Sequence, residues 1–130
     1  MRKVFVCLAL VAGAFSATNI QAEQASSAGG DAVAGKVAYD NVCRTCHTSL
    51  APPLEGVLGR NVAGVAAFDS YSAALKAKHE LTWTPANLDA FLKSPSSFAP
   101  GTYMVQATPD DTVRANLIAY LQTQKAPAQP

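Results

Sequence analysis

The chain has 130 residues, of which 49% are hydrophobic and 15% are charged, and its formal net charge is +1. This length suits one domain, and the composition is that of a soluble globular protein. Lys and Arg are scattered without a basic run, which argues against a nucleic-acid partner.

Residues 1–22 have the pattern of a secretory signal peptide. Arg2 and Lys3 supply the positive start, Val4–Ala14 is apolar, and small and polar residues lead to Ala22 as the cleavage position. A membrane anchor is the alternative, but the apolar run is about 14 residues long, and a spanning helix needs about 20. We therefore predict export to the periplasm.

The rest of the chain divides into a lead-in, one domain and a tail. Residues 23–30, EQASSAGG, predict a flexible lead-in, residues 31–124 form the domain, and residues 125–130 predict a disordered tail. Without residues 1–22 the chain keeps eight Lys and Arg against nine Asp and Glu, a formal charge of about −1. It then holds two cysteines, Cys43 and Cys46.

Helical patterns begin at four places in the domain. Asp31 and Thr84 are suitable N-caps, Pro85 suits a first helical position, and Tyr71 opens a short helical stretch. Thr108, as a cap, and Pro109 open the last helix. The apolar positions expected to face the core are Val33, Val37 and Tyr39; Leu88, Phe91 and Leu92; and Val113, Leu117, Tyr120 and Leu121.

Two stretches read as loops. Residues 48–70 are rich in Gly, Pro and Ala, and residues 94–104 form a proline-punctuated loop that ends at Met104. We see no strand alternation, so the fold class is all-α, with four to five short helices and long loops. Side chains alone would make a thin core, which a large apolar cofactor at the centre would complete.

The segment CRTCH, residues 43–47, holds the side chains that could bind a metal or a cofactor. Zinc needs four ligands, and beyond Cys43, Cys46 and His47 the chain offers only His79. A thioredoxin-like redox pair needs a βαβ context, which is not visible. Covalent haem c fits the spacing, because two thiols on one helical turn bond the vinyl groups and the next imidazole reaches the iron. We predict one haem c per chain, attached through Cys43 and Cys46, with His47 as an iron ligand.

The second axial ligand must come from elsewhere in the chain. Met104 is the only methionine besides Met1, and it lies in a P-G-T-x-M loop where core methionines are unusual. His79 is the competitor, but it lies in the charged stretch KAKHE. We predict that Met104 is the ligand.

These residues resemble the class I cytochromes c, the group of bacterial cytochromes c2 and mitochondrial cytochrome c. Gly35-x-x-x-Tyr39-x-x-x-Cys43 looks like the family's N-terminal helix, and RANLIAYL, residues 114–121, looks like the C-terminal helix that it crosses. PPLEGVLGR, residues 52–60, resembles the segment whose first carbonyl, here that of Pro52, accepts the proton of the histidine ligand. LTWTPANLDAFLKSP and FAPGTYM resemble the segments that cover the haem and deliver the methionine.

The resemblance also implies which residues hold the haem propionates and where this chain departs from the family. The propionate candidates are Arg60, Tyr71, Trp83 and Thr102. Phe91 and Leu75 replace a tyrosine and an amide donor that are frequent in the family. The residues Ser96, Ser97 and Tyr103 occupy positions that are often lysines in mitochondrial forms, so the basic docking ring is mostly missing.

The functional prediction is a one-electron carrier, not an enzyme. Its partners are redox proteins that donate or accept electrons, such as a membrane complex, an oxidase or a dehydrogenase, and the protein itself is a soluble monomer. Two alternatives stay open: a cytochrome subunit dedicated to one periplasmic dehydrogenase, and a haem sensor or peroxidase in which Met104 is displaced. Carbon monoxide binding by the reduced protein would separate the last class from a carrier.

Overall fold

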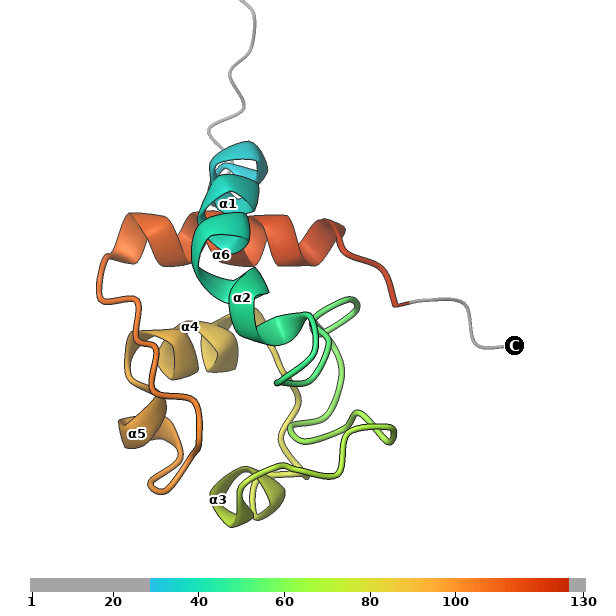
Figure 1. Ribbon diagram of the computed structural model, residues 1–130. Helices are drawn as coiled ribbons and strands as arrows, with labels where there is room; N and C mark the ends of the chain where they lie inside the picture. The colour runs from blue at the N-terminus through green and yellow to red at the C-terminus, as the bar shows by residue number, and fades with distance from the viewer. Residues whose placement is uncertain (1–28, 127–130) are drawn as a thin grey trace, which may run out of the picture.

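The computed structural model describes residues 29–126, in which short helices and long loops enclose a central region (Figure 1). The predicted signal peptide, most of the lead-in and the end of the tail lie outside these residues. The helical elements are α1 (Ala32–Ala38), the π-helical turn η1 (Tyr39–Cys43), α2 (Arg44–His47), α3 (Ala73–Lys76), α4 (Pro85–Lys93), α5 (Pro95–Phe98) and α6 (Asp111–Thr123).

The predicted all-α class is confirmed. Over the described residues the only β-type pairing is one isolated antiparallel bridge, between Asn61 and Thr82. None of the helices described is long and apolar enough to pass through a membrane.

The N-terminal and C-terminal helices cross at close range (Figure 1). A Cβ atom added to Gly35 of α1 would lie 1.9 Å from the carbonyl oxygen of Asn116 and 2.9 Å from Cβ of Tyr120, both in α6. Gly30 meets the same helix, because its added Cβ would lie 2.3 Å from the carbonyl carbon of Ala115. Glycine is therefore required at this crossing for its lack of a side chain.

A π-helical turn interrupts the first helical stretch just before the CRTCH segment. The backbone N–H of Arg44 bonds to the carbonyl of Tyr39, five residues back, and α2 then continues the helix to His47. One extra residue in the turn rotates the following side chains by about 100° relative to a regular α-helix. The rings of Tyr39 and Tyr120, 5.2 Å apart, pack the same turn against α6.

The predicted core positions are confirmed in α4 and only in part elsewhere. Leu88, Phe91 and Leu92 are buried in α4, and Leu117 and Leu121 are buried in α6. The expectation for α1 was wrong: Val33 is 77% and Val37 57% exposed. The close contact through Gly35 turns these valines away from α6, and Val113 also lies at the surface.

The predicted start of the last helix was wrong by two residues. The N-cap is Asp110, not Thr108, and its carboxylate accepts a hydrogen bond from the backbone N–H of Val113 at 2.9 Å. The carbonyls of Thr108 and Pro109 instead accept hydrogen bonds from Arg114, so both residues stay outside the helix. The stretch expected as a loop after Lys93 also contains the short helix α5.

The long loop between α2 and α3 is confirmed as a stretch without helix. It is tied to the residues before α4 by backbone hydrogen bonds from Gly59 to Trp83, from Trp83 to Arg60, and from Val62 to Leu81. Within the loop, the side chains of Val57 and Val62 are buried. At its start, the N–H of Gly56 donates to the carbonyl of Gln124, which ties the loop to the end of α6.

We expect Gly35→Ala to destabilise the protein by about 3 kcal/mol, because the new methyl group can be accommodated only by separating α1 from α6. The free energy of unfolding, measured by denaturant titration of the purified variant, tests this. Gly29→Ala is the matched control, since its added Cβ meets no atom within 4 Å. An unchanged stability for Gly35→Ala would contradict the close crossing.

Candidate haem site

A cavity of about 490 Å³ lies between the helices and the long loops. Its walls come from distant parts of the sequence: the residues after α2, the residues before α4, helices α4 and α6, and the segment that joins α5 to α6. The apolar side chains that line it include Leu54, Val57, Phe68, Leu75, Trp83, Leu88, Phe91, Leu92, Leu117 and Leu121. A cavity of this size and character suits a large, flat, mostly apolar ligand.

The cysteines and the histidine of the CRTCH segment all line this cavity. Cys43 ends the π-helical turn, and Cys46 and His47 belong to the helical turn after it. The pKa of the Cys43 thiol is raised to about 11, mainly by burial and to a smaller extent by the nearby Cys46. The cavity therefore favours an uncharged sulfur at this position, which both a thiol and a thioether satisfy.

One ring nitrogen of His47 is already engaged. Its Nδ1 lies 2.7 Å from the carbonyl oxygen of Pro52. A carbonyl can only accept, so Nδ1 carries the proton and Nε2 is the nitrogen available to a metal. This is the contact that the resemblance to the cytochromes c implied for Pro52.

Met104 lines the same cavity from the segment between α5 and α6. That segment, orange in Figure 1, lies on the opposite side of the view from the loop of residues 48–72, in green. The backbone N–H of Thr102 donates to the carbonyl of Ala99, and the N–H of Met104 approaches Oγ1 of Thr102 at 3.4 Å. The structure thus brings the predicted methionine to the cavity that holds the CRTCH side chains.

His79, the competing ligand, lies elsewhere. Its side chain is 63% exposed and pairs with the neighbouring Glu80 at 2.8 Å, and it is not among the residues that line the cavity. Among the residues that the structure describes, no three His, Cys, Asp or Glu side chains converge as a metal site.

Arg60, Tyr71 and Trp83 form a polar corner of the cavity. Arg60 and Trp83 are held together because the N–H of Trp83 donates to the carbonyl of Arg60 at 2.8 Å. The guanidinium of Arg60 donates to the carbonyl of Pro53 at 2.9 Å, and burial lowers its pKa. Burial raises the pKa of Tyr71, whose hydroxyl accepts from the N–H of Val65. Thr102, the fourth propionate candidate, lines the cavity beside Met104.

The donor set fits haem c. Two thiols, an imidazole with Nε2 available and a thioether lie around one apolar cavity, and a cationic side chain and two aromatic donors occupy one corner. When bound, haem c supplies an iron centre that exchanges one electron.

Comparison with known proteins identifies the family, although no protein-family model matches the chain. Over 100 residues the chain is 43% identical to the cytochrome c-type cyt cy of Rhodobacter capsulatus, covering 72% of this chain and 49% of that protein. It is 44% identical over 100 residues to cytochrome c of Tetrahymena pyriformis, covering 72% of this chain and 89% of the relative. The chain belongs to the cytochrome c family.

The likeness extends to solved structures of this family. Cytochrome cH from Methylobacterium extorquens superposes with a TM-score of 0.67 at 37% identity, covering 72% of this chain and 99% of that one. The chain spans about half the length of the Rhodobacter relative and nearly all of the Methylobacterium one. Cytochromes c are electron carriers rather than enzymes, which confirms the predicted class of protein.

Sequence reasoning missed two features of this cytochrome. Phe68 and Val57 line the cavity from the long loop, where no periodicity marks them as apolar contacts. The side chain of Arg114 is almost fully buried, although Arg114 was expected only as part of the C-terminal helix. The spacing of Asp111 and Arg114, three residues apart on one helix face, was the available signal for an ion pair there.

We expect Cys43→Ala and Cys46→Ala each to leave one thioether at most and to lower the yield of holoprotein. Each variant removes one of the two sulfur atoms in the cavity that can bond a vinyl group. Mass spectrometry of the acid-denatured protein, together with the pyridine haemochrome spectrum, counts the thioether bonds. Fully cross-linked holoprotein in normal yield from either variant would refute covalent attachment at these positions.

Proposed function

We propose that the protein is an exported one-electron carrier with one haem c, bonded through Cys43 and Cys46 and ligated by His47 and Met104. The observation that carries the proposal is that these four side chains line one apolar cavity, with Nδ1 of His47 bonded to the Pro52 carbonyl. The bound haem supplies the one-electron couple of its iron. The electron comes from one redox protein and passes to another.

The ligands proposed suit a carrier and not a catalyst. His47 and Met104 together would hold the haem iron and leave no iron position open to a substrate. The Pro52 carbonyl orients the imidazole, and the soft thioether of Met104 would favour Fe(II) and so raise the potential of a bound haem. The mostly apolar lining would offer water few hydrogen-bond partners between these ligands.

Arg60, Tyr71, Trp83 and Thr102 are the residues that we assign to the propionates. Arg60 is the only Lys, Arg, Asp or Glu among the described residues that line the cavity, and its charge would offset that of a carboxylate. Its backbone pairing with Trp83 keeps these two donors in one place.

The mouth of the cavity carries few charges, which favours partners with an apolar docking surface. Val42, Leu50, Tyr103 and Val105 line the cavity and are exposed. Arg44, a nearby cation, pairs with Asp40 at 3.6 Å. Ser96 and Ser97, whose positions are often lysines in mitochondrial forms, lie on α5 and do not line the cavity.

The cellular setting is part of the proposal. Residues 1–22 act as a signal peptide, residues 31–124 form the working domain, and the monomer moves between redox proteins of the periplasm. Covalent haem attachment outside the cytoplasm and the N-terminal sequence pattern support this setting.

Met104→Ala is expected to yield a high-spin or water-ligated haem with a markedly lower potential, because a soft ligand to Fe(II) is lost. The absorption spectra of both oxidation states and a potentiometric titration measure the change. His79→Ala is the matched control and should keep the wild-type spectrum.

Two outcomes would contradict the assignment. An unchanged low-spin spectrum in Met104→Ala would remove Met104 as the ligand and point to His79. Rapid carbon monoxide binding by the reduced wild-type protein would favour a sensor or a peroxidase over a carrier.

We expect electron transfer with the physiological partner to change only a few-fold between low and moderate ionic strength. The mature chain has a formal charge of about −1, and exposed charges more than about 8 Å from the contact are screened at physiological salt. Stopped-flow kinetics across a salt series measures the dependence. A fall in rate of several orders of magnitude would show that cations converge on the docking face.

A further inference from the structure

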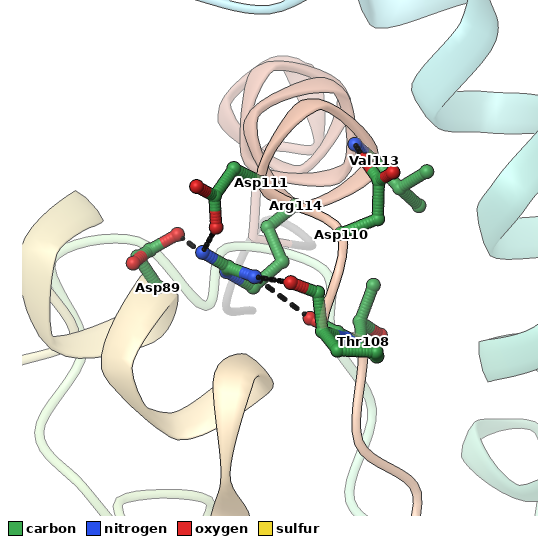
Figure 2. Close-up of polar contacts among 7 residues, drawn as sticks. Asp89, Thr108, Asp110, Asp111, Val113 and Arg114 are labelled. Carbon is green, nitrogen blue, oxygen red and sulfur yellow. Dashed lines mark hydrogen bonds and ion pairs between the residues drawn. The ribbon is translucent and has the colours of Figure 1, made fainter.

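Arg114 is a buried cation at the junction of α4, α6 and the segment that follows Met104 (Figure 2). Only 2% of the residue is exposed. Its Nε donates to Oδ1 of Asp89 in α4 at 2.7 Å, and a second nitrogen pairs with Asp111 at the start of α6. The guanidinium in turn lowers the pKa of the Asp111 carboxyl, so this pair stays ionised at neutral pH.

The third nitrogen of Arg114 reaches the main chain. Nη1 donates to the carbonyl of Thr108 at 2.9 Å and to that of Pro109 at 2.7 Å. The N–H of Thr108 also donates to the carbonyl of Leu92 at 2.7 Å, at the end of α4. The chain just before α6 is therefore fixed to both helices at Thr108 and Pro109.

Thr108 and Pro109 thus anchor the chain, and Thr108 lies four residues after Met104. Between Thr102 and Thr108, the described chain makes no backbone–backbone hydrogen bond, so the positions of residues 103–107 depend on the two ends of this segment. Four residues span at most about 14 Å, which limits how far Met104 can move while Thr108 is held. Tyr103 and Val105 on either side of Met104 are 75% and 92% exposed, so their packing adds little.

Arginine is suited to this junction by its shape. Its planar fork donates to Asp89 on one side and to the two carbonyls on another, which a lysine ammonium cannot do from one nitrogen. Asp89 and Asp111 compensate the charge of the buried guanidinium, while both carboxylates keep contact with solvent.

We propose that Arg114 is a positioning residue that holds the end of the Met104 segment and so sets how readily Met104 leaves the cavity. This rests on the proposed ligation by Met104. Loss of the anchor should favour a state in which the segment is open while the helices remain folded, because local opening has its own free energy.

The test is a titration of the oxidised holoprotein with imidazole, followed by its absorption spectrum. An external ligand binds only when Met104 has left, so its apparent affinity rises with the population of the open segment. We expect Arg114→Lys to raise the imidazole affinity about tenfold or more. Amide hydrogen exchange of Thr108, whose N–H is bonded to the carbonyl of Leu92, should accelerate in the same variant, while exchange in α1 should change less.

The matched control is Ile118→Val. Ile118 is buried in the same helix but does not line the cavity, and its truncation by one methylene group lowers global stability modestly. We expect wild-type imidazole affinity in this variant. If Arg114→Lys yields no holoprotein, Asp89→Ala removes only the ion pair between Arg114 and α4 and should raise the imidazole affinity about two- to threefold.

Two results separate the failure of this inference from that of the proposed ligation. Wild-type imidazole affinity in Arg114→Lys, or in Asp89→Ala where that variant replaces it, would overturn the positioning role while Met104 remains the ligand. An equal rise of the imidazole affinity in Ile118→Val would also overturn the positioning role, since the change in affinity would then follow the global stability of the protein. An unchanged spectrum in Met104→Ala would instead overturn the ligation on which the inference rests.

Discussion

The apolar cavity at the centre is the constraint on which the rest of the structure depends. Protein interiors are close-packed, so a cavity of about 490 Å³ is far larger than the voids that a packed core leaves empty. The loops of residues 48–72 and 99–110 have little regular structure of their own, and several of their apolar side chains, among them Leu54, Val57 and Phe68, line this cavity. A large apolar group inside it would therefore complete the core that the loops enclose.

The crossing of α1 and α6 organises both sides of that cavity. Gly35 lets α1 approach α6 closely, and the chain continues through the π-helical turn to place His47 at the cavity. Two residues before the contact with Asn116, the same α6 carries Arg114, which holds the segment after Met104. The pair of α1 and α6 thus helps to position both proposed iron ligands, His47 and Met104, although these lie far apart in the sequence.

The distribution of polar groups suits a protein that passes electrons without binding a substrate. Arg60 brings its charge to one corner of the cavity, and the Pro52 carbonyl holds the imidazole of His47. Around the mouth, side chains such as Leu50 and Val105 are exposed and apolar. Short-range contact, more than long-range attraction, would then select the partner.

The sequence by itself determined the local features. The spacing of Cys43, Cys46 and His47, the cap at Thr84 and the apolar period of α4 depend on neighbours within a few residues, so they could be predicted. Only the tertiary structure decided the outward position of Val33, the approach of Phe68 to the cavity and the burial of Arg114. These depend on contacts between residues far apart in the chain: the partners of Arg114 span from Asp89 to Asp111, and Val33 is exposed because Gly35 carries the contact with α6.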